Sequence, residues 1–287
     1  MYEQRAKPAQ GGIQGQQQFG SFPSSGWGYA FAGDADRGYG RKQPGGWIYQ
    51  TLPYIEETTL HDLGKGQAET PKKAANTTRL AAVLAILDCP TRGRADLKPF
   101  TKNDYFNANA TPFVAGSDYA GNGGSQGFGN GDARVKGDSS LLTMTKDSDV
   151  ENYFSASSGT LMKHNGITFI RSEVKSAHIK DGLSKTYYIG ERYLDFRFYE
   201  VNTGDDDQSW DSGYDWDVNR WTNAEPKFDQ NPGSPTSNGN FGSAHLATFN
   251  MAFCDGSVRA VPYEVSFAVH TALGNRAGGN DDLSQIP

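Results

Sequence analysis

The sequence has little cysteine, no long apolar run and no excess of positive charge. Its 287 residues include two cysteines, Cys89 and Cys254. No Cys-X-X-Cys or paired Cys/His spacing is present, so the sequence does not predict a structural zinc site. The net charge of −6 argues against a nucleic-acid-binding face, which needs clustered Lys and Arg. Because no apolar run reaches about 18 residues, no segment is expected to span a membrane.

Several catalytic motifs are missing as well. The metalloprotease motif His-Glu-X-X-His and the phosphate-binding motif Gly-X-X-X-X-Gly-Lys do not occur. The five histidines are scattered singly, at spacings that do not suit metal binding. The sequence therefore predicts a non-enzymatic protein.

The chain divides by composition into a lead-in and one domain. Residues 1–25 are rich in Gln, Gly and Ser and have no helical or strand period, which predicts a flexible segment. Residues 26–287 show no internal repeat and no clear boundary, so a single domain is expected. The 35 glycines and 13 prolines of the whole chain favour turns over long helices. The fold class predicted is α+β, with an antiparallel sheet, short helices and long loops.

Local patterns place some elements. Thr70 and Pro71 are typical of a helix start, and the Ala-rich body predicts a helix to about residue 81, followed by a strand that ends at Cys89. Gly and Asn dominate residues 115–132, which predicts a loop. Apolar alternation around Tyr187 predicts a strand, and the spacing within 265–273 predicts a short helix.

The stretch "GSAHLATFNMAFCDGSVRAV", residues 242–261, predicts a β-hairpin. With Asp255 and Gly256 at the centre of a two-residue type I′ turn, one face of the hairpin becomes apolar. That face contains Phe249, Met251, Phe253, Val258 and Ala260. A one-residue slip would destroy this face, so the turn is expected to fix the register.

His245 precedes Asp255 by ten positions, which raises the question of a catalytic pair. An extended strand of that length separates the two by roughly 30 Å. We therefore expect no pair, and we expect His245 to anchor the start of the strand through hydrogen bonds to the backbone.

An acidic stretch, "GDDDQSWDSGYDWDVNRW", covers residues 204–221. Calcium is bound by six to eight oxygen ligands, which carboxylates in one loop can supply. The candidate ligands are Asp205, Asp206, Asp207, Asp211, Asp215 and Asp217. Their spacing does not match the twelve-residue calcium loop of helix-loop-helix proteins, and a solvated acidic loop is the alternative.

Three tryptophans, Trp210, Trp216 and Trp221, are interleaved with these aspartates. Exposed aromatic faces stack on sugar rings while neighbouring carboxylates accept hydrogen bonds from hydroxyl groups, which suggests a carbohydrate-binding surface. The alternative is that the three side chains belong to the core.

Five ordered blocks resemble one family of bacterial, planctomycete-type prepilin-like proteins. The blocks are "FPSSGWGYAFAGDADRGYGRKQPGGWIYQTLPYIEETTLHDLG", "LDCPTRGR", "SDYAGNGG", "IKDGLSKTYYIGERYL" and "FGSAHLATFNMAFCDGSVRAV". The family's C-terminal signature is H-X9-DG, met here by His245, Asp255 and Gly256. The resemblance implies a pilin-like globular domain, exported to the cell surface or the extracellular space.

The resemblance also carries expectations about partners and ligands. It implies a non-enzymatic structural subunit that assembles with itself or with a type II secretion or type IV pilus-like apparatus; a secreted carbohydrate-binding module is the alternative. It favours a disulfide between Cys89 and Cys254, and it favours Ca²⁺ at the acidic loop. Family members normally begin with a leader and a long apolar helix. Residues 1–21 contain neither, so the chain is either a truncated or processed form, or a member that has lost its anchor, and assembly through a helix bundle is not expected.

Overall fold

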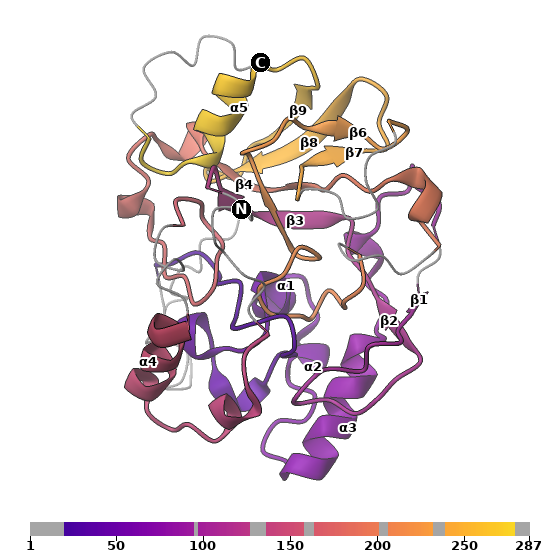
Figure 1. Ribbon diagram of the computed structural model, residues 1–287, viewed down its shortest axis with the longest axis vertical. Helices are drawn as coiled ribbons and strands as arrows, with labels where there is room; N and C mark the ends of the chain where they lie inside the picture. The colour runs from indigo at the N-terminus through magenta and orange to yellow at the C-terminus, as the bar shows by residue number, and fades with distance from the viewer. Residues whose placement is uncertain are drawn as a thin grey trace.

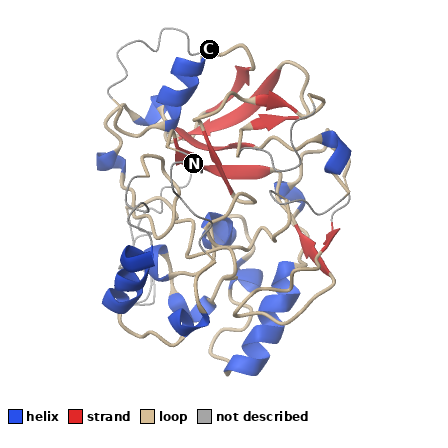
Figure 2. Cartoon of the chain, viewed as in Figure 1, coloured by secondary structure: helices blue, strands red, loops and turns tan. Residues whose placement is uncertain are grey.

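The computed structural model describes residues 20–94, 97–126, 136–157, 164–200, 206–231 and 239–278. Its helices and strands are short and are joined by long connections (Figure 2). The helices are α1 (Trp47–Thr51), α2 (Thr58–His61), α3 (Glu69–Leu80), α4 (Asp147–Ser157) and α5 (Phe267–Gly274). The strands are β1 (Leu97–Pro99), β2 (Phe113–Ala115), β3 (Tyr119–Gly124), β4 (Tyr187–Glu191), β5 (Asn219–Trp221), β6 (Lys227–Phe228), β7 (Gly242–Ser243), β8 (Thr248–Phe253) and β9 (Val258–Pro262). The protein is therefore α+β, as predicted.

A five-stranded sheet lies in the upper half of the view, and helices α1 to α4 lie below it (Figure 1). The strand order is β5-β3-β4-β8-β9. β3 and β5 run parallel, and the other neighbours are antiparallel. Two ribbons complete the described strands: β1 pairs with β2 in antiparallel fashion, and β6 pairs with β7 in parallel. The predicted antiparallel sheet is confirmed, with one parallel pair at its β5 end.

Strand β3 occupies the segment whose glycine content predicts a loop. A Cβ atom on Gly121 would lie 2.3 Å from Thr168 Oγ1, and one on Gly123 would lie 2.4 Å from Trp221 Nε1. Both separations are far shorter than a van der Waals contact, so glycine allows these neighbours to pack directly on the strand. The loop prediction is wrong here because the glycines serve close packing inside a sheet.

The Asp255-Gly256 turn is present, but its centre lies one residue earlier than predicted. Gly256 donates its N–H to Phe253 O at 2.9 Å, which makes Cys254 and Asp255 the central residues of the turn. Gly256 itself has a φ of 87°, in the left-handed region that favours glycine. It forms a bulge after the turn, and this bulge adds one residue to the loop.

This bulge shifts the pairing of β8 with β9 by one residue. Phe249 faces Val261, and Met251 faces Arg259. Phe249, Met251 and Val261 are buried, as predicted for the β8 residues. Val258, in contrast, is 68% exposed, so its predicted place on the apolar face is wrong. Arg259 instead covers the apolar face with its guanidinium, which lies 4.3 Å from the centre of the Phe253 ring.

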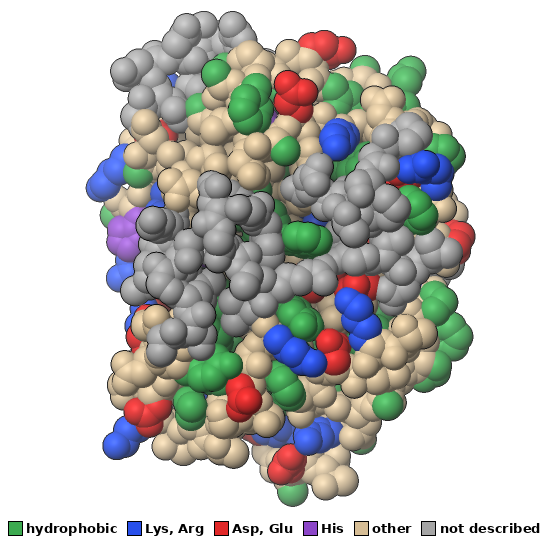
Figure 3. All heavy atoms as spheres, in the orientation of Figure 1, with side chains coloured by type: hydrophobic (Ala, Val, Ile, Leu, Met, Phe, Trp, Pro, Cys, Tyr) green, Lys and Arg blue, Asp and Glu red, His purple; other side chains and the backbone are tan. Residues whose placement is uncertain are grey.

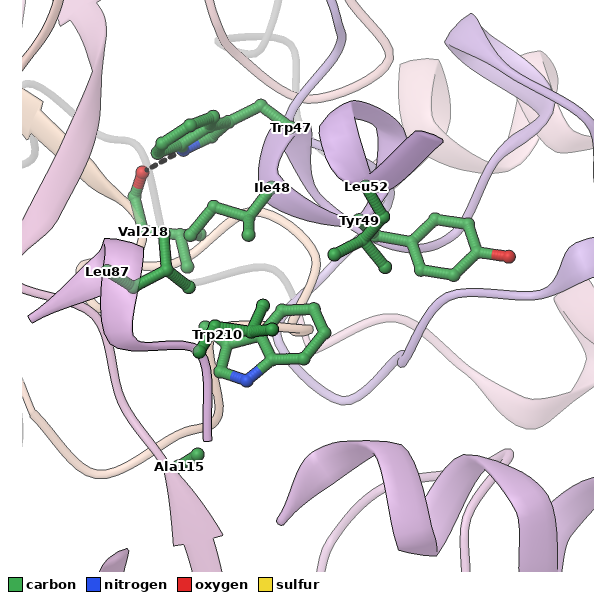
Figure 4. Packing of buried hydrophobic residues seen from close by; sticks show 9 residues of the cluster. Trp47, Ile48, Tyr49, Leu52, Leu87, Ala115, Trp210 and Val218 are labelled. Atoms are coloured by element: carbon green, nitrogen blue, oxygen red, sulfur yellow. Dashed lines mark hydrogen bonds between the residues drawn. The ribbon is translucent and has the colours of Figure 1, made fainter. Parts of the chain in front are cut away.

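Helix α5 packs on the β8 residues of the sheet through Val269 and Leu273. This confirms the helix predicted near the C-terminal end. A second cluster lies around α1, where Trp47, Ile48 and Leu52 pack against Trp210 (Figure 4). These contacts bring the first helix and the acidic loop into one core.

The first 25 residues differ in part from the predicted flexible lead-in. Residues 1–19 of the predicted flexible lead-in lie outside the described residues, but residues 21–25 are buried. Phe22 is 1% exposed and its ring centre lies 4.9 Å from that of Tyr188, so order begins before residue 26.

Helix α3 is confirmed, although it begins at Glu69 after Ala68. The strand predicted after it is a 3₁₀ turn, Ala85–Leu87.

In the part of the chain that the structure describes, no helix has the length and apolar character needed to cross a bilayer.

Candidate functional site

The acidic loop is not a solvated surface, because its described aspartates are buried and held by different partners. Asp205 lies outside the described residues. Asp211 pairs with Arg79, whose Nε lies 2.8 Å from Oδ2, and neither side chain is exposed. Burial raises the pKa of Asp211, and the Arg79 charge offsets part of this rise.

Asp206 is surrounded by cations. Lys98 Nζ lies 2.7 Å from its Oδ1, Arg94 Nη1 lies 2.8 Å from its Oδ2, and Arg192 also donates to Oδ1. Burial alone would raise the pKa of this carboxyl, but the three cations outweigh burial and hold the pKa well below its usual range. Asp206 is therefore a structural anion whose charge is already balanced, and it is not available to a metal ion.

Asp207, Asp215 and Asp217 come together. One carboxylate oxygen from each lies within 4.8 Å of the others, and all three residues are buried. The loop brings them together by closing on itself, since Gln208 donates its backbone N–H to Asp217 Oδ1 at 2.8 Å. Three of the six predicted ligands therefore lie close enough together to share one cation.

Two oxygens of this cluster accept no hydrogen bond from any described group. They are Asp207 Oδ1 and Asp217 Oδ2, and a third buried oxygen in the same loop, Gln208 Oε1, shares this property. A buried carboxylate oxygen without a donor is costly unless a cation or a proton balances it. Lys102 donates to the other oxygen of Asp207, so one of the three charges already has a partner.

The electrostatics of the cluster favour an added positive charge. Burial, and next the neighbouring Asp207 carboxylate, raise the pKa of Asp217 to about 6. Lys98 lies 3.9 Å away from Asp217 Oδ1, but its shorter contact is to Asp206, so it compensates only part of this repulsion. Oxygen-only donors of this kind suit a hard cation such as Ca²⁺, and Asp207, Asp215 and Asp217 are the residues that would hold it.

Two of the three tryptophans of the loop are buried in the core. Trp210 is 1% exposed and donates its indole N–H to Ala82 O at 2.8 Å, and Trp221 has no exposed surface. Trp216 is half-buried against the same core as Trp221. Buried rings cannot stack on a glycan, so the core alternative holds for Trp210 and Trp221, whereas Trp216 keeps part of its surface exposed.

His245 and Asp255 do not meet, as predicted. The side chain of Asp255 accepts hydrogen bonds from the backbone N–H and the hydroxyl of Ser257, at 2.8 and 2.7 Å, and thereby stabilises the turn. Among the described residues, the ring of His245 makes no hydrogen bond to the backbone, contrary to its expected role at the start of the strand. Its Nε2 lies 3.1 Å from Glu191 Oε1, and its Nδ1 lies 3.4 Å from Thr91 Oγ1.

Cys89 and Cys254 are not joined by a disulfide; both are buried free thiols. The Cys89 sulfur lies 3.9 Å from His245 Nε2. The Cys254 sulfur lies 3.8 Å from Tyr187 O, among the apolar residues that surround Phe22. The expected pairing is wrong because the two sulfur atoms point into different environments.

A Gly-X-Ser-X-Gly pattern at residues 123–127 was missed by the sequence reasoning. Its serine, Ser125, follows strand β3, and its hydroxyl accepts a hydrogen bond from Asn165 Nδ2 at 2.8 Å. Among the described residues no histidine is hydrogen-bonded to Ser125, so the pattern lacks the base that activates a serine nucleophile.

These observations define an α+β protein with a buried carboxylate cluster in a loop whose other described aspartates form ion pairs with arginine and lysine side chains. The chain belongs to the family described as "protein of unknown function (DUF1559)", whose model matches residues 14–268. No curated protein and no solved structure matches the chain.

Proposed function

We propose that the protein is a non-enzymatic, exported, pilin-like structural subunit whose globular domain is braced by Ca²⁺ and assembles with copies of itself. A type II secretion or type IV pilus-like apparatus is the setting in which such a subunit acts. The sequence blocks that resemble prepilin-like proteins support this class. The observation that carries the proposal is the buried cluster of Asp207, Asp215 and Asp217.

The burial of this cluster supports a structural role. Each of the three residues is at most 2% exposed, so a substrate has no access to their carboxylates. A cation at this point would hold the ends of the loop together. The same loop carries Trp210 into the core and Asp211 to Arg79, so its closure stabilises contacts that are distant in sequence.

The surface supports self-association. The β1–β2 ribbon exposes Leu97 (39%) and Phe113 (46%) on one side while it buries Lys98 and Val114 on the other. Hydrophobic side chains gather over this ribbon at the right edge of the space-filling view (Figure 3). Strand β9 is also the last strand of its sheet. Exposed apolar surface and a sheet edge are features through which subunits associate.

The test is assembly of the purified chain, followed by electron microscopy and sedimentation with calcium or with a chelator. We expect filaments or regular arrays in calcium, and their loss in the Phe113→Asp variant, because a charge in an apolar contact is costly. Thr145→Asp, which adds the same charge at an exposed position, is the matched control and should assemble normally. A chain that stays monomeric with calcium at high concentration would contradict the proposal.

A further inference from the structure

Three side chains from distant parts of the sequence converge beside strand β4. Cys89 follows the 3₁₀ turn Ala85–Leu87, Glu191 is the last residue of β4, and His245 precedes β8. The sulfur of Cys89, a carboxylate oxygen of Glu191 and a ring nitrogen of His245 all lie within 4.8 Å of one another. Cys89 and Glu191 are buried, and the His245 side chain is 33% exposed.

We propose that Cys89, Glu191 and His245 bind a divalent cation of the zinc class. Zinc is bound by thiolate, imidazole and carboxylate ligands at about 2.3, 2.0 and 2.1 Å. A tetrahedral arrangement with these bond lengths separates sulfur from nitrogen by about 3.5 Å and nitrogen from oxygen by about 3.4 Å. The distances in the structure, 3.9 Å from sulfur to Nε2 and 3.1 Å from Nε2 to Oε1, are close to both.

The donor set distinguishes this site from the aspartate cluster. A thiolate and an imidazole select zinc and similar late transition metals, whereas calcium and magnesium prefer oxygen ligands alone. With a zinc ion, the thiolate and the carboxylate balance the two positive charges, so the buried site becomes neutral. The inference does not rest on the proposed function, because no residue is shared with the aspartate cluster.

Neighbouring groups hold each ligand in place. Asn250 donates its backbone N–H to Glu191 Oε2 at 2.6 Å, which leaves Oε1 facing His245. The hydroxyl of Thr91 lies 3.4 Å from the second ring nitrogen of His245. Asp118 Oδ2 accepts the backbone N–H of Cys89 at 2.6 Å. Outer contacts of this kind orient the ligands of metal sites.

The geometry does not match a catalytic cysteine triad. In such a triad the histidine faces the nucleophile with one ring nitrogen and the orienting carboxylate with the other. Here the sulfur of Cys89 and the carboxylate of Glu191 both face Nε2, while Nδ1 faces Thr91. Burial also raises the pKa of the Cys89 thiol, which disfavours the free thiolate that a nucleophile needs. Two ligands that converge on one nitrogen lone pair are instead suited to a shared metal ion.

Three protein ligands leave a fourth position for water or another small ligand, as in zinc sites with an open position. The His245 side chain is 33% exposed, so solvent reaches this edge of the site.

The test is a titration of the full chain with Co²⁺, after chelator treatment and in the presence of a phosphine reductant. We expect one equivalent of Co²⁺ to produce a thiolate-to-cobalt charge-transfer band and intense visible bands of tetrahedral geometry, and Zn²⁺ to remove both. Calcium should remove neither. A wild-type chain that shows no charge-transfer band would overturn the inference, whatever the variants do.

Variants assign the ligands. Cys89→Ser should abolish the charge-transfer band, and His245→Ala should weaken binding strongly. The matched control is Cys254→Ser, which removes the other buried thiol and should leave the spectrum unchanged. Thr91→Val, at a positioning residue, should weaken Zn²⁺ binding about 10- to 100-fold with the same cobalt spectrum. A band that survives in Cys89→Ser, or disappears in Cys254→Ser, would contradict the assignment.

Discussion

Arg79 and Asp211 form an ion pair that is closed to solvent, with Arg79 Nε 2.8 Å from Asp211 Oδ2 and neither side chain exposed. The pair connects helix α3 to the acidic loop. Gly33 takes part as well, because its N–H donates to Asp211 Oδ1 at 3.1 Å and its carbonyl accepts from Arg79 Nη2. Three segments of the chain therefore depend on one buried charge pair.

Replacing Asp211 with Ala should lower the free energy of unfolding by about 3–5 kcal/mol, because it leaves the Arg79 charge buried without its partner. Chemical denaturation measures this loss. The control is Glu69→Ala, which removes a surface pair with Lys73 on the same helix, where Glu69 is 81% exposed. That change should cost less than about 1 kcal/mol. Equal losses of unfolding free energy in the two variants would show that the buried pair contributes no more to stability than the surface pair.

Calcium should raise the melting temperature of the protein relative to a chelator. At a calcium concentration about 100 times the dissociation constant, binding to the folded state alone adds about 2.7 kcal/mol to the free energy of unfolding. Asp207→Asn and Asp217→Asn should each remove this response, whereas Asp149→Asn, on the exposed side of α4, should keep it. Equal midpoints of the wild-type chain in calcium and in chelator would exclude calcium at this loop.

Without calcium, the free energy of unfolding should depend on pH through the protonation of the Asp217 carboxyl. Its pKa is about 6 in the folded protein and about 4 in an unfolded chain, so the folded state binds the proton more tightly. The contribution of this group to stability is therefore present below pH of about 4 and decreases as pH rises to about 6. The difference in unfolding free energy between wild type and Asp217→Asn, measured in chelator across this range, isolates the effect. A difference that is independent of pH would contradict the raised pKa.

Local patterns predicted several elements correctly. An Ala-rich segment indicates helix α3, apolar alternation indicates strand β4 and four-residue spacing indicates helix α5, and each of these signals lies within about a dozen residues. The Asp255-Gly256 turn was predicted for the same reason. Its exact centre was not, because an Asp-Gly pair fits either a two-residue turn or a turn followed by a glycine bulge. The second arrangement is the one that buries Val261 with Phe249 and Met251.

Long-range convergence could not be predicted from spacing. Cys89, Glu191 and His245 meet only because β4 pairs with β8 and because the turn after α3 packs beside them. Asp207, Asp215 and Asp217, three of the six predicted ligands, lie close together, and their binding of calcium stays a prediction. The sequence offered no means to assign Asp206 and Asp211 to arginines elsewhere in the chain. Strand β3 was missed because its glycines are explained by their neighbours Thr168 and Trp221.

The two cysteines should react as free thiols. Thiol titration of the chain, unfolded without reductant, should give two thiols per molecule. The unfolding midpoint should also be the same with and without reductant, because no crosslink constrains the unfolded state. Cys254→Ser should titrate with one thiol and serves as the calibration. Fewer than one thiol per wild-type molecule would contradict this expectation and would indicate a disulfide between Cys89 and Cys254.

Gly256→Val should destabilise the protein by about 1–3 kcal/mol, because the backbone at this position has a φ of 87°, which a β-branched residue resists. The bulge at Gly256 sets the register of β8 and β9, and that register places Phe249 and Val261 on the buried side. Gly256→Asn is the matched control, since Asn tolerates the left-handed region, and it should lose much less stability. Denaturant unfolding of the three proteins gives the comparison. If Val and Asn cost the same, the loss comes from the added side chain, and the left-handed backbone is not what the glycine provides.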